Sequence, residues 1–240
     1  AEIYNLKILK KNIQDAYHNT TRFFIMKNKL ERYAYNINSN YVIQEGKELY
    51  NNSKGNWHKI FNNKNPLVLE LACGNGEYTV ERSIIDPEKN FIGLDIKGAR
   101  IWKGVKELEK YKPKNAFFLR IQIENIIDFF KKDEVEEIII SFPDPRPKKR
   151  DIKKRLTNFN FLKLYYEILN KNGRLILKTD DDNLFNFSID EIKSSKFILN
   201  DYTKDLHSSS KFDLYKSVKT KYEKKFLLQG KKIKLLECLK

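Results

Sequence analysis

The sequence predicts an α/β protein built on an open, doubly wound and mostly parallel sheet. Short apolar runs alternate with stretches of helical periodicity, beginning with the run at residues 67–71. A turn that holds Gly74 and Gly76 joins this run to a helical stretch that starts at Glu77. Several later runs also end in acidic or amide side chains, and the carboxyl ends of strands are where such sheets bind ligands. The order of strand, glycine turn and helix therefore predicts a nucleotide-binding α/β domain.

Each expected element follows from its own local pattern. The expected strands are apolar runs between turn residues, and the expected helices carry apolar residues every three or four positions. These strands cover residues 67–71, 91–95, 116–121, 138–140, 174–178, 197–202 and 233–239. The helices begin at residue 77 and cover 97–111, 126–131, 159–169 and 184–194. We expect Gly173 to cap helix 159–169, and Asp181 or Asp182 to cap helix 184–194.

Composition bounds the class of protein. With 240 residues, 40% hydrophobic and 33% charged, the chain fits one globular domain, or one domain with an extension. No segment approaches the ~20 consecutive apolar residues of a membrane helix, and the first residues lack an export signal pattern. The two cysteines, Cys73 and Cys238, lie far apart, and the three histidines are scattered. We therefore expect a cytoplasmic protein with no metal site and no membrane contact.

The net charge of +15 favours an anionic partner. The chain is also rich in Lys, Asn and Ile, as an AT-rich genome would make it, so the local clusters carry more weight than the total. Six of the eight residues 148–155 are Lys or Arg. This segment is expected to contact phosphates, although a charge run is often only a solvated face.

A boundary is predicted at Asn65-Pro66. Residues 1–63 are expected to form a basic and aromatic N-terminal extension that packs on the main domain, residues 64–240. The basic side chains of Arg22, Lys27, Lys29 and Arg32 either touch a phosphate backbone or are simply solvated.

Two acidic residues near the glycine turn distinguish between possible cofactors. Asp95 follows the second strand, where a carboxylate can accept both hydroxyl groups of a ribose. Glu70 closes the first strand, where it would repel a pyrophosphate but suit a cationic ligand. Thr79 stands where a dinucleotide site needs a third small residue. These residues favour S-adenosylmethionine over NAD, with Gln122 placed to meet the adenine.

The loop after residue 140 is expected to be stiff and to present one acid. Pro143, Pro145 and Pro147 end the strand because each lacks a backbone donor and holds φ near one value. Asp144 lies among them, directly before the basic segment. A carboxylate beside a polyanion-binding segment suggests chemistry on a nucleic acid; the simpler interpretation is a proline-rich turn with solvated charges.

Four sequence blocks resemble the signature of bacterial tRNA (guanine-N7)-methyltransferases, which modify guanine 46 in the variable loop. The resemblance extends from about Pro66 to the C-terminus, with the blocks in the family's order. The blocks are Phe142-Pro-Asp-Pro-Arg-Pro-Lys-Lys-Arg150, Lys154-Arg-Leu156, Leu177-Lys-Thr-Asp180 and Thr220-Lys-Tyr-Glu223.

The resemblance implies a Rossmann-like class I methyltransferase with a seven-stranded sheet, S-adenosylmethionine as cofactor and tRNA as partner. Asp144 is the implied catalytic residue. The implied cofactor contacts, with the glycines of the turn, are Glu70, Gly74, Gly76, Asp95, Gln122 and Asp144. The implied substrate and RNA contacts are Lys148, Arg150, Lys153, Lys154, Arg155, Asp180, Thr220, Lys221, Tyr222 and Glu223.

Three positions depart from the family pattern. Ala72 stands where the family usually has a glycine, and Arg146 stands where a tryptophan is common. Gln122 replaces an acid or amide of the family. Ala72 and Gln122 leave open a non-catalytic RNA-binding protein on a methyltransferase fold. A methyltransferase for another RNA site or a small molecule is a second alternative. A dehydrogenase is disfavoured by Glu70. The sequence does not distinguish a monomer from a homodimer.

Overall fold

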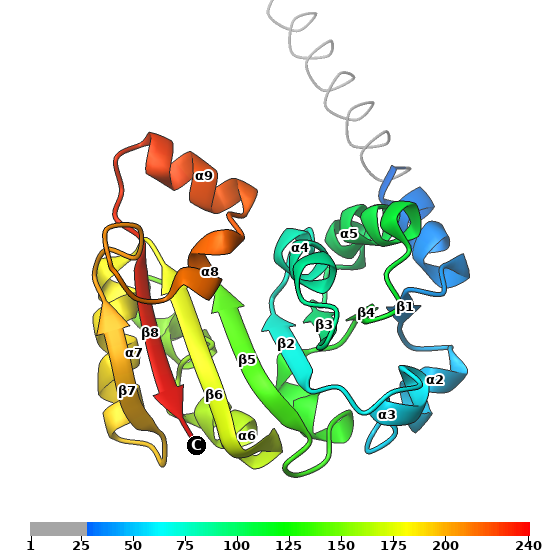
Figure 1. Ribbon diagram of the computed structural model, residues 1–240, viewed down its shortest axis with the longest axis horizontal. Helices are drawn as coiled ribbons and strands as arrows, with labels where there is room; N and C mark the ends of the chain where they lie inside the picture. Colours follow the sequence, from blue (N-terminus) through cyan, green and yellow to red (C-terminus); the bar gives the residue numbers. More distant parts are fainter. Residues whose placement is uncertain (1–27) are drawn as a thin grey trace, which may run out of the picture.

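The computed structural model describes residues 28–240 and contains one eight-stranded sheet with helices on both faces (Figure 1). Along the sheet the order is β1-β4-β3-β2-β5-β6-β8-β7. The strands are β1 (Val42–Ile43), β2 (Leu67–Leu71), β3 (Asn90–Leu94), β4 (Ala116–Leu119), β5 (Val135–Ser141), β6 (Leu169–Thr179), β7 (Ile198–Thr203) and β8 (Lys234–Leu239).

Helices connect most of the strands. Residues 28–38 are helical and precede β1. The α-helices are α2 (Glu48–Asn52), α3 (Trp57–Ile60), α4 (Glu77–Ile85), α5 (Gly98–Tyr111), α6 (Phe159–Ile168), α7 (Asp182–Lys193), α8 (Asp213–Ser217) and α9 (Lys221–Leu228). Two 3₁₀ helices, η1 (Ile123–Asp128) and η2 (Lys149–Lys154), follow β4 and the loop after β5.

The chain winds outward from the centre of the sheet in both directions. From β2 it proceeds through β3 to β4 on one side, and from β5 to β6 on the other, with all these neighbours parallel. The strand order therefore reverses between β2 and β5, and open α/β sheets bind ligands at this switch point. Strand β8 is antiparallel to both β6 and β7.

Burial on both faces explains why the central strands are almost wholly apolar. Every residue of β2 is buried: Leu69 and Leu71 face one core cluster, while Val68 faces another beneath α4 and α5. This arrangement is typical of parallel sheets with helices on both sides. It confirms the predicted fold class.

The sheet has one strand more than the seven that were expected. Residues 64–240 supply seven strands, and the eighth, β1, comes from the preceding segment and pairs with β4. Trp57 fixes this segment to the main domain: its indole N–H donates to the carbonyl of Phe129 at 3.0 Å, and its ring stacks on Phe130. A two-residue strand has no periodicity to detect, so the sequence pattern did not predict it.

Other expectations need correction or lie outside the described residues. Gly173 does not cap α6, because α6 ends at Ile168 and the chain enters β6 at once, with Leu169 paired to Val135. The helix expected at 126–131 is the 3₁₀ helix at 123–128. Arg22 and Lys27 are not among residues 28–240. Within that range no helix is both long enough and apolar enough to cross a membrane.

Candidate active site

The carboxyl ends of five strands meet at one edge of the sheet. The pairings of Leu94 with Leu119, Leu71 with Leu94 and Leu71 with Ile140 place the ends of β4, β3, β2 and β5 side by side. Ser141 is paired with Lys178, which brings the end of β6 next to them. The residues predicted from the strand ends therefore lie along the same edge.

The glycine turn after β2 has left-handed backbone at three positions. The φ angles are +54° at Ala72, +58° at Gly74 and +72° at Gly76. Gly76 is the N-cap of α4, and a Cβ there would overlap the ring of Phe118. Glycine is required at this position by both its backbone and its neighbour. Ala72 adopts the same backbone region with a Cβ, which costs about 1–2 kcal/mol.

Glu70 is buried and fixes the start of α4. Its Oε2 accepts hydrogen bonds from the backbone N–H of Thr79 at 3.0 Å and from the Thr79 hydroxyl at 2.5 Å. The pKa of Glu70 is raised to about 8, chiefly by desolvation: the hydrogen bonds from Thr79 lower it, and the nearby Glu77 and Asp95 add smaller increases. Thr79 therefore has a structural role that explains why no third small residue stands there.

Asp95 organises the turn from the neighbouring strand. Its two carboxylate oxygens accept the backbone N–H groups of Gly74 at 2.9 Å and of Lys97 at 2.8 Å. Asp95 is buried, while Gln122 is exposed at the N-cap of η1. Each oxygen of Asp95 keeps a further lone pair for a ligand hydroxyl. Asp95, joined by Glu70 when that carboxyl group is ionised, makes a negative surround that repels a pyrophosphate and attracts a cation.

The loop after β5 holds Asp144 between two strained residues. Phe142 has φ +50° and Arg146 has φ +48°, and such left-handed bulky residues cluster at functional sites. The side chain of Asp144 is 61% exposed. It accepts the backbone N–H of Arg146 at 3.1 Å and pairs with the guanidinium Nε of Arg146 at 3.3 Å. The acid is thus presented to solvent on a constrained backbone.

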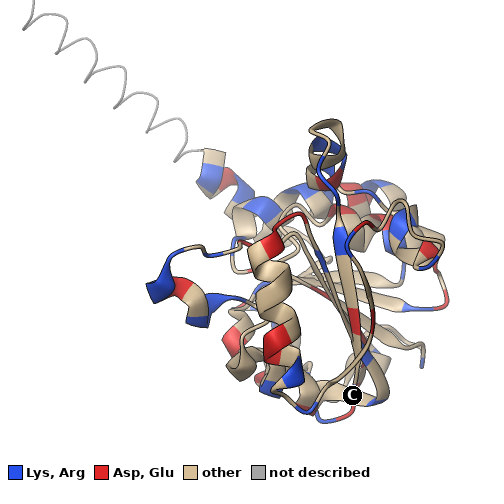
Figure 2. Cartoon of the chain, turned by 90° about the vertical axis from the view of Figure 1, so that its left-hand side faces the viewer, with Lys and Arg blue, Asp and Glu red and all other residues tan. Residues whose placement is uncertain are grey.

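The basic segment divides into an exposed part and one buried residue. Lys148, Arg150, Lys153 and Lys154 are exposed, and Figure 2 shows their segment projecting from the body of the molecule. Lys154 pairs with Asp151 at 3.1 Å, a surface contact that adds little stability.

Arg155, which was expected to contact RNA, is only 7% exposed in this structure. Its Nε donates to the carbonyl of Pro145 at 2.9 Å, and its Nη2 donates to that of Arg146 at 3.3 Å. The guanidinium also lies 4.5 Å from the ring of Phe187. Arg155 therefore holds the loop that carries Asp144.

The block at residues 220–223 forms the start of α9. The hydroxyl of Thr220 accepts the backbone N–H of Glu223 at 3.3 Å, a capping contact, while Lys221 and Tyr222 are exposed. Glu223, the fourth residue of the block expected to contact the substrate, is completely buried. Its carboxylate pairs with Lys178 at 2.7 Å.

Lys178 is the buried partner that the sequence analysis did not single out, although it lies in the block at 177–180. Its ammonium also donates to the carbonyl of Tyr215 at 2.8 Å. Burial lowers the pKa of Lys178, and Glu223 opposes this shift. The other oxygen of Glu223 lies 2.9 Å from Nε2 of His207. These contacts fix α8 and α9 to β6.

Asp180 and Asp181, at the end of β6, have different roles. Asp180 pairs with Lys231 at 2.5 Å and is mostly buried. Asp181 accepts the backbone N–H of Leu184 at 2.7 Å and caps α7, which confirms one of the two predicted caps. Of the two acids, Asp180 stands next to the loop of Asp144 through the pairing of β5 with β6.

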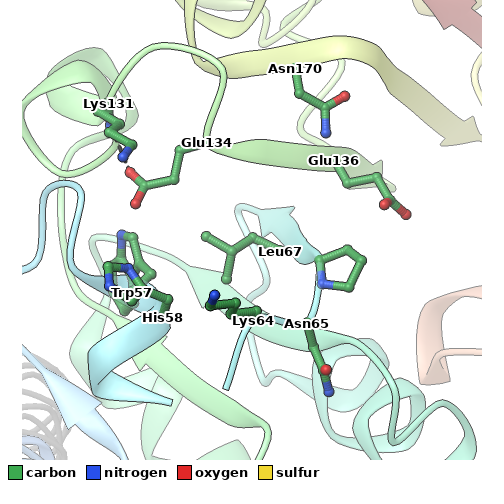
Figure 3. Close-up of a pocket in the computed structure, with 10 residues that line it drawn as sticks. Trp57, His58, Lys64, Asn65, Leu67, Lys131, Glu134, Glu136 and Asn170 are labelled. Atoms are coloured by element: carbon green, nitrogen blue, oxygen red, sulfur yellow. Dashed lines mark hydrogen bonds between the residues drawn. The ribbon is translucent and has the colours of Figure 1, made fainter. Parts of the chain in front are cut away.

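Two cavities lie at the opposite, amino edge of the sheet. One, of about 230 Å³, is lined by Trp57, Lys64, Glu134 and neighbouring residues (Figure 3). The other, of about 540 Å³, lies along α6 and is lined by Phe159, Tyr166 and Lys240 among others. Neither includes any of the predicted site residues. No cluster of three potential metal ligands occurs among residues 28–240.

Comparison with known proteins identifies the family. A family model described as "Putative methyltransferase" matches residues 64–236, while a prephenate dehydratase model matches only residues 1–31. A tRNA (guanine-N(7)-)-methyltransferase of Cytophaga hutchinsonii is 37% identical over 87% of this chain and 96% of its own length. One from Bacteroides fragilis is 41% identical over 89% of this chain and 86% of its own.

The chain belongs to the tRNA (guanine-N7)-methyltransferase family. Solved structures agree on the fold. The 16S rRNA methyltransferase KamB superposes with a TM-score of 0.60 over 78% of this chain and 94% of its own, at 12% identity. An antibiotic-related methyltransferase gives a TM-score of 0.57 over 78% and 92%, at 18% identity. At such identities the likeness establishes a methyltransferase fold and nothing finer.

Proposed function

We propose that the protein transfers a methyl group from S-adenosylmethionine to N7 of guanine 46 in the variable loop of tRNA. The observation that carries this proposal is the juxtaposition at the switch point of the sheet. There the acid-lined glycine turn after β2 lies beside the loop that presents Asp144 and the exposed basic segment. Membership of the family supplies the reaction class.

The residues around the glycine turn fit a cationic cofactor. Glu70 and Asp95 would face its positively charged part and its ribose, and the backbone of Gly74 and Gly76 permits close approach. Gln122, exposed at the end of β4, would meet the adenine. When bound, this cofactor supplies an electrophilic methyl group on a sulfonium. Cys73 and Cys238 are free and buried, which fits a reducing compartment.

The chain needs no strong general base for this reaction, because guanine N7 carries a free lone pair at neutral pH. Its contribution is to align the base with the methyl group at attack distance. Positive charge grows on the purine as the methyl group moves. Asp144 can stabilise that charge and accept hydrogen bonds from N1 and N2 of the guanine. Asp180, next to it, can share this role if Lys231 releases it.

The exposed basic residues place the RNA. Lys148, Arg150, Lys153 and Lys154 would contact phosphates, which fixes orientation without reading sequence. Lys221 and Tyr222, exposed at the start of α9, would add further substrate contacts.

The deciding experiment combines the protein with labelled methyl donor and unmodified tRNA, followed by cleavage at N7-methylguanine. A single cut at position 46 is the expected result. Label incorporated at another base would favour the alternative of a different RNA site. Calorimetry that shows tRNA binding but no heat with S-adenosylmethionine would favour the non-catalytic RNA-binding alternative.

A further inference from the structure

The start of α9 is held by the helix that follows the glycine turn. The backbone N–H of Lys221 donates to Oε2 of Glu77 at 2.6 Å, across 144 positions of sequence. Lys221 is the first residue of α9, and Glu77 is the first residue of α4. The proposed cofactor turn and the proposed substrate segment thus meet through one side chain.

The bond suits both helix ends. The first N–H groups of a helix have no partner within it, and a carboxylate there is favoured by the helix dipole. Thr220 satisfies the N–H of Glu223, and Glu77 satisfies that of Lys221. Farther along α4, burial raises the pKa of Glu81, and the nearby ammonium group of Lys224 partly offsets this rise. Two acids of α4, Glu77 and Glu81, therefore lie near the first two turns of α9.

The backbone of Glu77 is tied to the glycine turn. It follows Gly76 directly, and the left-handed Gly76 has no room for a side chain beside Phe118. The carboxylate of Glu77 is also close enough to Glu70 to raise the pKa of that residue. A change in the turn or in the charge balance around Glu70 therefore reaches Glu77.

The far side of α9 is already fixed. Glu223 is paired with the buried Lys178 of β6, and this contact anchors one side of the first turn of α9. The opposite side of that turn, at Lys221, can move about the anchor. The bond from Lys221 to Glu77 determines where that turn sits relative to the cofactor turn.

We infer that Glu77 is a positioning residue that couples cofactor binding to RNA binding. A cation bound at the glycine turn orders Glu77, Glu77 holds the start of α9, and Lys221 and Tyr222 are then set for the RNA. This inference rests on the proposed function. Coupling between two binding sites is reciprocal, so RNA must tighten the cofactor by the same factor as the cofactor tightens RNA.

The test measures that factor with S-adenosylhomocysteine, which cannot donate a methyl group during the titration. Its Kd is determined by calorimetry with and without saturating tRNA, and the Kd of tRNA is determined with and without S-adenosylhomocysteine. In the wild type, each ligand is expected to lower the Kd of the other about tenfold, within the usual range for coupled sites. Glu77→Ala is expected to reduce the factor to about one.

Two matched variants separate the bond from general effects. Glu77→Gln keeps an oxygen that can accept the Lys221 N–H, so it is expected to retain most of the coupling. Glu88→Ala removes an exposed acid just beyond the other end of α4 and should leave the factor unchanged. Thermal melting checks that the variants fold. If Glu77→Ala does not, Glu77→Asp, one methylene shorter, takes its place.

Three outcomes would overturn the inference. They are wild-type coupling retained in Glu77→Ala, a wild-type factor of one, and a Glu77→Ala defect in cofactor affinity that is equal with and without tRNA. The last would make Glu77 a simple cofactor contact. A wild type that methylates tRNA but shows no coupling refutes this inference alone. A wild type that binds neither ligand refutes the proposed function.

Discussion

Acidic side chains at the same edge of the sheet are held in opposite ways on its two sides. Beside the glycine turn, Glu70 and Asp95 are buried, and backbone N–H groups fix their oxygens. In the loop after β5, Asp144 is exposed and paired only with Arg146. The first environment raises the pKa of a carboxyl group, whereas the second leaves a carboxylate facing solvent.

The difference matches the size of the two proposed ligands. The protein can surround a small cation, so the carboxyl groups that bind it can be buried and oriented before it arrives. A base on a folded RNA arrives from outside, so its carboxylate must be exposed, and the rigidity has to come from the backbone. Left-handed residues on both sides of Asp144 cost about 1–3 kcal/mol each. The bonds from Arg155 to the loop carbonyls help to offset that cost.

The largest effect is expected at Asp144. Asp144→Ala should lower the single-turnover methylation rate about 100- to 1,000-fold, the usual loss when one preorganised electrostatic contact is removed. Because the side chain is exposed, melting should be unchanged. Rapid-quench kinetics measures the rate, and Asp151→Ala, in the same basic segment, is the control. If Asp144→Ala keeps the wild-type methylation rate, the exposed carboxylate of Asp144 has no role in the transfer.

The cofactor side should instead depend on pH. Glu70 has a pKa of about 8 in the free protein, so it is mostly protonated at pH 6–7, and a cation prefers the ionised form. Cofactor affinity should rise about tenfold per pH unit up to pH 8 and then level off. Calorimetry across this range measures the slope. Glu70→Gln, which cannot ionise, should bind weakly and show none of the rise; a flat wild-type profile would contradict the assignment.

A smaller contrast is expected within the basic segment. Arg155→Ala should destabilise the fold by about 2 kcal/mol, because it removes two charged hydrogen bonds and leaves two carbonyls unpaired. Lys153→Glu with Lys154→Glu should leave melting unchanged but raise KM for tRNA and flatten its salt dependence. Melting curves and KM at several salt concentrations separate the two. Equal melting temperatures for both variants would show that Arg155 is not structural.

The smallest effect concerns the glycine turn. Ala72→Gly should stabilise the protein by less than about 1 kcal/mol, because relief of the left-handed strain is partly cancelled by the greater entropy of the unfolded chain. Gly76→Ala is the contrast in the same turn and should destabilise the protein by more, about 1–3 kcal/mol, since its Cβ would overlap Phe118. Thermal melting measures both. A lower melting temperature for Ala72→Gly would mean that the alanine methyl packs favourably.

The sequence alone was enough to predict the sheet and its edge. Buried parallel strands are continuous apolar runs, and glycines and prolines mark where they stop, so β2 and the loop at Asp144 could be located from local patterns. Parallel strands place their carboxyl ends together, which is why Glu70, Asp95 and Asp144 could be predicted to share an edge. The cap at Asp181 is equally local.

Only the tertiary structure decided which charged residues face inward. Arg155 and Lys153 look alike in the sequence, yet Arg155 is buried against Pro145 and Phe187 while Lys153 is exposed. Likewise, Glu223 has the spacing of a capping box with Thr220, but its carboxylate turns to Lys178 instead. The reason is physical: burial and pairing depend on residues that are distant in the chain, and no local pattern encodes them.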